Sequence, residues 1–524
     1  MNLLDAEVIT VAGVDGTDRL SLPDLLARLL VGPEILGCPR LAAEQRSYWW
    51  RFLVRCAARA LRTADLTVSQ ATHTDNVQLA TVVREALLKH TERADWELFQ
   101  PDPSSAGFLQ PPTPGGVTPA DDKYKRCTCA LLTAVIGTKE HERKSEVGRV
   151  LDAESLVYAL VEYQSGVIFG GRGNYESQLT GSRAGAGSGT PFMGATINNS
   201  MLDTFRHDVG VLLGNWERTA RDLKGDVWAL WAHRWDGEKP LPAAQLDPAF
   251  IPLARMVRVG APTEGEFGTV WFRGSQGSRV ADHTNGGHLG DPFTPLVPDP
   301  KGGHLKVRGT LAKGYDYKEV VRLLFPDTNE EAVPSPSVVA VLDAPPEREL
   351  RVLFEGMAFE QGKTRGFHRR SVRLPRKAVQ VGIGFRSEPI HAIHRIMLDR
   401  TADCKRALSS ALAMLLTGEP RLRDDDRAKA QTALDRFEEL VDRNYLDFLF
   451  RLAFDGESTG DTEPYRRWLF EQAVEEVLPE AFRSLPRNSG RRLEQEVIAE
   501  AYLRGRLRKD LDLPVADSRQ EVTA

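Results

Sequence analysis

Hydrophobic and polar positions alternate at the start of the chain and then change to a longer period. Residues 8–12 alternate, which predicts a strand, and turn residues at 14–16 end it. Ser21 follows with a proline two positions later, a pattern that begins helices, so we expect a capped helix through Leu30. The chain therefore opens with a short strand and a helix.

The next part of the chain mixes helical spacing with short strands. Residues 41–63 and 76–92 place apolar side chains at steps of three and four, the spacing of amphipathic helices. An apolar helix over about 150–170 runs into a glycine-rich stretch that extends to Gly189. Short β-like runs follow at 227–231, 269–272 and 350–354.

Glycine and proline become scarce after Pro389, and helical periodicity dominates from there. The pattern predicts helices over about 390–416, 426–452, 463–483 and 489–510. Four helices with short connections favour a bundle whose neighbours are mostly antiparallel. We expect an α+β protein, with a large mixed α/β domain of short strands and long loops over 1–387, a four-helix bundle over 388–511 and a tail over 512–524.

Length and composition are those of an ordinary globular protein. The chain has 524 residues, enough for two or more domains, and its net charge of −5 is unusual for a free-standing, sequence-blind DNA binder. Its five cysteines form neither a disulfide framework nor a zinc knuckle, which favours a reducing compartment. The acidic start is unlike a signal peptide and no apolar run is long enough to span a bilayer, so we expect a cytoplasmic protein without membrane contact.

The strongest local feature is the glycine-rich stretch, which includes Gly170, Gly171, Gly173 and Asn174. Glycine lets a backbone adopt positive φ and approach a ligand closely, with its amide groups exposed as donors. The stretch lacks the Gly-Lys-Ser/Thr ending of a Walker loop and the strand that precedes a dinucleotide fingerprint. A mobile surface loop and a backbone-mediated contact with nucleic acid both remain open.

Two charged segments add candidate contacts. Residues 362–377 hold seven formal positive charges and no acid, which favours a contact with phosphate or acidic protein groups over a solvated basic face. The basic candidates are Lys363, Arg365, Arg369, Arg370 and Arg373. The other segment mixes donors and acceptors that can read base edges, although a charged loop is the plainer interpretation. It consists of Thr138, Lys139, Glu140 and His141.

Two enzyme patterns are present but incomplete. Ser458 lies in a Gly-x-Ser-x-Gly string that follows a helix end, whereas a nucleophile elbow follows a strand. His391 and His394 can share a helix face, yet no third ligand stands at suitable spacing, and His283 with His288 is no better. We expect no catalytic residues, metal or cofactor. A metal-dependent or serine hydrolase and a helical-bundle scaffold are the alternatives.

Several segments follow one another in an order that one family shares. They are Met1 to Leu4, Leu20 to Leu25, Phe108 to Pro112, Gly137 to Glu142, Phe169 to Asn174, Gly189 to Pro191 and Phe250 to Arg258. Together with the closing helices they resemble the CasA family, the large subunit of the type I-E CRISPR surveillance complex Cascade.

The resemblance implies a non-catalytic subunit that checks the short motif flanking the target, the PAM, while crRNA pairing supplies the longer specificity. It implies support of R-loop formation and a set of partners. These are the other Cascade subunits, crRNA, double-stranded target DNA and a helicase–nuclease.

The same resemblance assigns site residues by position. Gly170, Gly171, Gly173 and Asn174 fall on the family's glycine loop, and Thr138, Lys139, Glu140 and His141 fall on its first recognition loop. Arg279 falls near a minor-groove lysine of the family. No asparagine–glutamine pair marks the strand-splitting wedge, and the nearest hairpin-like region, 337–346, carries other residues.

Overall fold

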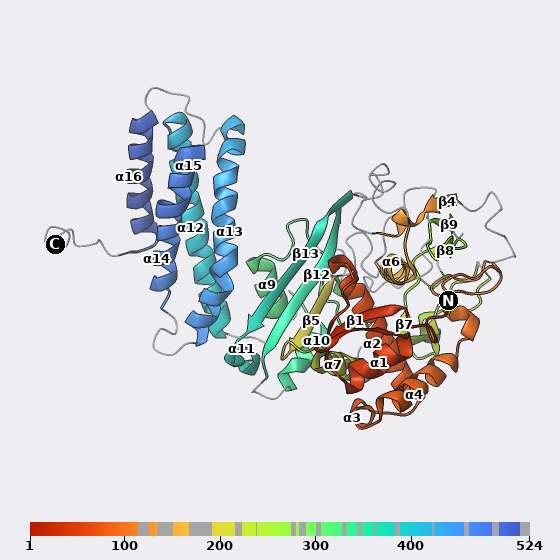
Figure 1. Cartoon of the computed structure of the whole chain (residues 1–524). Coiled ribbons are helices and arrows are strands. Elements are labelled where there is room, and N and C mark those ends of the chain that lie inside the picture. The colour runs from red at the N-terminus through yellow and green to blue at the C-terminus, as the bar shows by residue number, and fades with distance from the viewer. Residues whose placement is uncertain are drawn as a thin grey trace. The chain divides into compact units, whose positions relative to one another are not determined.

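The chain divides into two compact units in a computed structural model. The first comprises Met1–Tyr315 and Thr328–Val379, and the second comprises Asp316–Asp327 and Gln380–Ala524. The residues that the structure describes are 1–113, 125–133, 150–166, 191–214, 223–236, 238–273, 279–281, 290–299, 305–326, 332–343, 348–360, 363–381, 383, 388–421, 424–454, 461–484 and 492–513. Within these ranges the first unit is mixed α and β and the second is helical, as the α+β prediction requires (Figure 1).

The opening of the chain confirms the predicted strand and helix. Strand β1 (Ile9–Gly13) pairs antiparallel with β2 (Gly16–Leu20), and β3 (Ile35–Gly37) completes a three-stranded sheet in the order β2-β1-β3. Helix α1 (Leu22–Val31) begins at Ser21, whose side chain accepts a hydrogen bond of 3.4 Å from the backbone of Asp24. The hydroxyl satisfies one of the amide groups that a helix start leaves unpaired.

Helix α2 (Arg46–Thr63) is the centre of the first unit. It packs against α4 (Asn76–Leu88), α6 (Ala153–Ser165) and α7 (Met201–Gly214), so apolar side chains on all its sides are buried. The short helix α3 (Val68–Thr72) lies between α2 and α4 in the chain. Helices α2, α4 and α6 match the helical spacing of the sequence, whereas α7 was not predicted from it.

Short strands form the remaining sheets. One sheet has the order β13-β12-β5 and combines β13 (Lys363–Leu374), β12 (Leu350–Glu360) and β5 (Phe192–Ile197). A second has the order β4-β9-β8 and combines β4 (Lys125–Thr128), β9 (Thr269–Arg273) and β8 (Met256–Val259). Two-stranded pairs join β6 (Val227–Ala229) to β7 (Leu246–Ile251) and β10 (Leu296–Pro298) to β11 (Leu305–Val307).

The hairpin-like reading of residues 337–346 was wrong for the part that the structure describes. Helix α10 (Pro336–Val339) and a 3-10 turn (Ala340–Asp343) occupy it. Pro336 stands at the first helical position, where its fixed φ favours a helix and its missing amide costs nothing. The run of Val and Ala that looked like a strand is therefore a helical turn.

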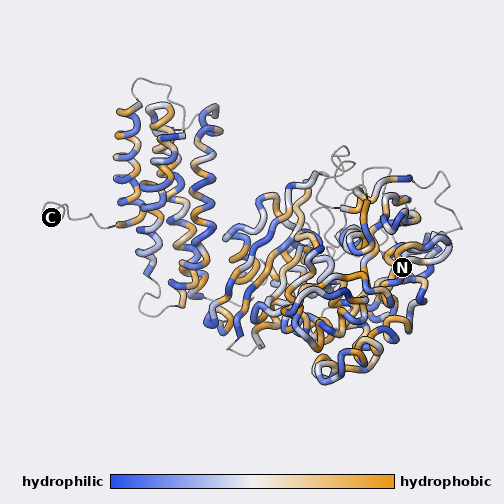
Figure 2. Tube along the Cα trace, in the orientation of Figure 1, coloured by the Kyte–Doolittle hydropathy of each residue, from blue (hydrophilic) through white to orange (hydrophobic). Residues whose placement is uncertain are grey.

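The second unit confirms the helical pattern after Pro389. Its helices are α12 (Glu388–Thr417), α13 (Asp424–Phe454), α14 (Glu463–Glu471), a π-helical segment (Gln472–Val477), α15 (Leu478–Ser484) and α16 (Arg492–Asp510), preceded by α11 (Arg376–Val381). Apolar and polar residues recur along each long helix (Figure 2). Helix α12 contacts both α13 and α16. Across the described ranges, every helix is either too short or too polar to cross a lipid bilayer.

Helix α9 (Tyr317–Leu324) belongs to the helical unit and was not among the helices predicted from the sequence. The Tyr317 ring stacks on Tyr445 of α13 at 4.2 Å, and the Tyr317 amide donates a hydrogen bond of 2.6 Å to Asp442. Phe325 packs edge-on against Phe450. The helix is short and has one apolar face, so it needs a larger partner to bury that face.

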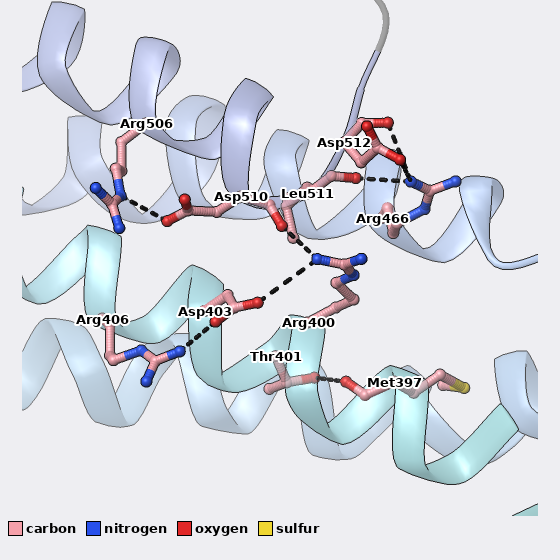
Figure 3. Close-up of polar contacts among 10 residues, drawn as sticks. All are labelled: Met397, Arg400, Thr401, Asp403, Arg406, Arg466, Arg506, Asp510, Leu511 and Asp512. Atoms are coloured by element: carbon pink, nitrogen blue, oxygen red, sulfur yellow. Dashed lines mark hydrogen bonds and ion pairs between the residues drawn. The ribbon is translucent and has the colours of Figure 1, made fainter. Parts of the chain in front are cut away.

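Two arginines complete the C-terminal end of α16. Arg400 of α12 donates to the carbonyl of Asp510 at 2.6 Å, and Arg466 of α14 donates to the carbonyl of Leu511 at 2.9 Å (Figure 3). The last carbonyl groups of a helix have no partner inside the helix, and cations interact favourably with its C-terminal dipole. These contacts hold α12, α14 and α16 in one arrangement.

We expect Leu324→Ala to destabilise the helical unit by about 2–5 kcal/mol, because it leaves a cavity under a fully buried side chain. Hydrogen exchange measured by mass spectrometry should accelerate in peptides from α13. The exposed neighbour Lys318, whose ammonium lies 5.3 Å from the centre of the Tyr317 ring, supplies the control, since Lys318→Arg keeps a cation there and should leave exchange in α13 unchanged. Faster exchange confined to the first unit would contradict the assignment of α9.

Candidate nucleic-acid interface

The glycine-rich stretch runs between α6 and β5. Its candidates Gly170, Gly171, Gly173 and Asn174 lie outside the described residues, and so does the segment Thr138, Lys139, Glu140 and His141. The structure does describe the residues on both sides of the glycine-rich stretch. They show how each of its ends is attached to the first unit.

Gln164 fixes the end at α6. Its fully buried amide donates to the carbonyl groups of Leu109 at 2.8 Å and Arg255 at 3.0 Å, and its side-chain oxygen accepts from the Arg255 amide at 2.9 Å. Gly166 then ends the helix, where a side chain would come within 2.8 Å of the Glu162 carbonyl. The three hydrogen bonds of Gln164 and the tight packing at Gly166 therefore fix the point where the chain leaves α6.

Arg51 and Arg55 of α2 fix the end at β5. Arg51 donates to the carbonyl of Pro191, directly before β5, and its Nε lies 3.1 Å from Asp291. Arg55 reaches the other oxygen of the same carboxylate at 3.1 Å. Both arginine side chains are buried. One carboxylate therefore clamps two guanidinium groups beside the point where the glycine-rich stretch rejoins the fold.

The charge state of this cluster follows from its surroundings. Burial by itself raises the pKa of the Asp291 carboxyl, but Arg51 and Arg55 outweigh burial and hold the pKa below its usual value. Burial also lowers the pKa of Arg55, and Asp291 opposes that shift. Arg59 continues the row and pairs with Asp247 at 2.6 Å. Each of these three arginines has a carboxylate partner, which compensates the burial of its charge.

Sequence reasoning missed this row of arginines. Arg51, Arg55 and Arg59 stand at steps of four, so they share one face of a helix whose other faces are apolar. That spacing was visible in the sequence. The acids were not, because Asp247 and Asp291 come from segments far along the chain.

Arg279 is enclosed by protein. Its side chain is 1% exposed, its guanidinium lies 5.7 Å from the centre of the Trp235 ring, and its Nε has no hydrogen-bond partner. Burial lowers its pKa to about 9, so it stays charged at neutral pH. A contact with a minor groove would require this side chain to move.

The predicted basic run forms strand β13. Arg369 and Arg373 lie on one face and are exposed, whereas Arg370 is on the other face and donates to the Tyr315 carbonyl at 2.9 Å. Arg365 is also exposed, at a bulge where the register with β12 shifts. Lys363 begins the strand opposite Glu360. Because side chains alternate along a strand, a run that is continuous in sequence divides between two surfaces.

Carboxylates from elsewhere balance part of this run. Glu355 of β12 stands directly opposite Arg369, and its fully buried side chain lies 3.1 Å from the Arg369 Nε. Glu349 lies 3.6 Å from Arg373. The sequence suggested that residues 362–377 had no balancing acid, but pairing with the neighbouring strand supplies two.

The candidate hydrolase residues do not form a site in the part of the chain that the structure describes. Ser458, His283 and His288 lie outside the described residues. His394 is hydrogen-bonded to the Tyr445 hydroxyl at 2.9 Å, and burial lowers its pKa to about 4, so it is neutral at pH 7. Among the described residues, no three His, Cys, Asp or Glu side chains come together as metal ligands would.

Comparison with known proteins assigns this chain to a family. The family model described as CRISPR-associated protein Cse1 matches residues 2–475. The chain is a member of the Cse1 family. No curated protein sequence matches it.

Solved structures share the fold of this Cse1-family chain over nearly its whole length. Cse1 from Thermobifida fusca has a TM-score of 0.67 at 14% identity, covering 98% of each chain. Cse1 from Acidimicrobium ferrooxidans has a TM-score of 0.66 at 15% identity, again covering 98% of each. CasA from Thermus thermophilus has a TM-score of 0.64 at 16% identity, covering 97% of this chain and 99% of that one.

We expect Asp291→Asn to destabilise this Cse1-family chain by about 3 kcal/mol at pH 7, because it leaves two buried guanidinium groups without a carboxylate. The folded-state pKa of Asp291 is lowered, so its contribution is present above the unfolded pKa of about 3.9 and is lost as pH falls through the folded value. The difference in the free energy of unfolding between wild type and Asp291→Asn should therefore shrink below about pH 4. Urea unfolding at several pH values measures it.

A surface carboxylate provides the control for this prediction. Asp5 is exposed and is paired with the half-buried Arg84 and the exposed Arg93. Asp5→Asn should cost less than about 1 kcal/mol at any pH. Equal losses for the two variants would mean that the cluster around Asp291 has no special role in stability.

Proposed function

We propose that this Cse1-family chain is the large, non-catalytic subunit of a crRNA-guided DNA surveillance complex of the Cascade type. In that complex it reads the PAM in the target duplex, supports R-loop formation and offers the surface to which a helicase–nuclease is recruited. The observation that carries the proposal is the match to the Cse1 family over residues 2–475.

The attachment of the glycine-rich stretch supports a role in PAM reading. A backbone that contacts DNA through its amide groups must be positioned, because ordering it on binding would consume affinity. Gln164 at one end, and Arg51 at the Pro191 carbonyl at the other, fix where the stretch leaves and rejoins the described fold. Gly170, Gly171, Gly173 and Asn174 are the proposed contact residues, with Thr138, Lys139, Glu140 and His141 as a second group.

The net charge of the chain also fits a complex in which the guide RNA recognises the target and the protein reads only the PAM. A net charge of −5 gives little general attraction to DNA, whereas guide pairing would supply most of the target specificity. The protein then needs only a short reading surface and local cations. Strand β13 offers the exposed side chains of Arg365, Arg369 and Arg373 for phosphate or for a neighbouring subunit.

We expect Gly171→Asp and Gly173→Asp each to abolish binding of the assembled complex to target duplex, because they place negative charge and bulk where a backbone approaches phosphate. The measurement is a gel shift on matched targets whose flanking bases are randomised, followed by sequencing of bound DNA. Wild-type complex should enrich a short flanking motif.

Gly185→Asp is the matched control, since it changes the same residue type in the same stretch outside the four candidates. It should retain binding and the enriched motif. If all three variants bind like wild type, the glycine-rich stretch does not read the PAM. If wild-type complex enriches no motif, the proposal of PAM recognition fails altogether.

A second prediction separates the two possible contacts of β13. If Arg365 and Arg373 meet phosphate, changing both to Gln should reduce the salt dependence of duplex binding by up to about two, since each neutralised phosphate contributes roughly 0.9 to the slope. Arg370→Gln, on the opposite face of the strand, should leave the slope unchanged. An unaltered slope with weaker subunit assembly would instead assign Arg365 and Arg373 to protein contact.

A further inference from the structure

A cavity of about 540 Å³ lies within the first unit. The sheet β13-β12-β5 forms one wall, and helices α1 and α2 with the start of α7 form the others. This volume falls in the range of pockets that hold small molecules or several side chains. The Asp291 cluster does not line it.

The inner part of the cavity is apolar. Leu25 and Trp49 from the helices and Leu353 from β12 line it, and each is at least 95% buried. Leu36 of β3 also lines the cavity and is 64% exposed, so apolar surface continues outward. An occupant would gain most by inserting a bulky apolar group.

Three arginines line the same cavity, in positions that solvent reaches. The side chains of Arg46, Arg351 and Arg369 are 35%, 41% and 52% exposed. They come from α2, β12 and β13, so the fold brings together cations from three separate elements. The cavity therefore combines an apolar interior with positive charge where solvent enters.

Much of the hydrogen-bonding capacity of two of these arginines is unused. Arg46 and Arg369 both direct Nε to one oxygen of Glu355, at 2.9 Å and 3.1 Å. One carboxylate thus faces two guanidinium groups and leaves a net positive charge. Within the described ranges, no hydrogen bond involves the Nη atoms of either arginine. Guanidinium groups bind carboxylates through paired N–H groups, so a second carboxylate fits here.

We infer that this cavity binds a segment of a partner protein in which a bulky apolar side chain stands next to an aspartate or glutamate. The apolar side chain enters between Trp49 and Leu353, and the carboxylate meets Arg46 and Arg369. Thr196 and Ser371, which also line the cavity, add hydroxyl groups that a peptide backbone can use.

Other occupants match these features less well. A nucleic-acid strand needs a continuous positive track, whereas here the interior is apolar and Glu355 and Glu349 stand among the arginines. A free fatty acid would satisfy the apolar interior and the arginines but leave the hydroxyl groups of Thr196 and Ser371 unused. A polypeptide segment uses all three kinds of group.

The test selects peptides without assuming a sequence. A random heptapeptide library is displayed on phage and selected on the full chain, with parallel selections on Ala43→Trp and Thr196→Trp. Both residues line the cavity, and Ala43 is exposed, so a tryptophan there obstructs the cavity without disturbing the core. Circular dichroism and thermal unfolding check that each variant is folded.

Peptides enriched on wild type and lost on both variants should carry a bulky apolar residue adjacent to Asp or Glu. Their affinity, measured by fluorescence anisotropy, should fall about tenfold with Arg369→Gln, since a charge-assisted hydrogen bond is lost. Arg370→Gln is the matched control on the same strand, because Arg370 is on the opposite face and does not line the cavity, and it should leave affinity unchanged.

Three outcomes would overturn the inference. Selection could yield no peptide that distinguishes wild type from the obstructed variants. The enriched peptides could lack an acid or bind Arg369→Gln as well as wild type. Finally, decanoate could bind wild type and not Thr196→Trp while no peptide does, which would assign the cavity to a free amphiphile. All measurements use the isolated chain, so they do not depend on PAM recognition.

Discussion

Buried arginines on one face of α2 are the interaction on which the first unit depends. Arg51 and Arg55 share Asp291, and Arg59 pairs with Asp247. Removing a charge from water costs several kcal/mol unless a partner compensates it. The helix can therefore be buried only when these distant carboxylates have reached it, which couples the packing of α2 to segments that close the fold much later in the chain.

This coupling determines position as well as stability. Apolar contacts such as those of Trp49 with Phe52 and Tyr158 tolerate small shifts, because they have no strict direction. A guanidinium donates hydrogen bonds to a carboxylate only in a narrow range of orientations. Arg51 also holds the carbonyl of Pro191, so the same directional contacts that place α2 also place the start of β5. The buried core therefore fixes the point at Pro191 where the glycine-rich stretch ends.

Local patterns made much of the fold predictable, whereas contacts across the chain did not. The helices after Pro389 and the cap at Ser21 depend on neighbours within one or two turns, and both were confirmed. The transfer of α9 to the helical unit depends on Tyr445 and Phe450, which no local pattern reveals. The hairpin-like interpretation of residues 337–346 was wrong because Val and Ala residues suit both a strand and a helical turn.

The candidate site shows the same limit. Glycine content identified the stretch around Gly171, because the chemical property is carried by consecutive residues. The basic run was visible for the same reason, yet its pairing with Glu355 depends on strand register, and its division into two faces follows from the alternation along β13. Sequence patterns thus marked candidate contact residues, and the tertiary structure showed which of the described ones already have a carboxylate partner.

The assignment of α9 to the helical unit has a consequence for modular exchange. The backbone passes between the units three times, after Tyr315, after Asp327 and after Val379. A single genetic crossover near residue 380 would exchange the bundle but leave α9 behind, so the apolar face around Tyr317 would pack against a helix from the other parent in place of α13. The bundle is therefore not a self-contained module. An exchange that keeps its packing must include the internal segment Asp316–Asp327 as well.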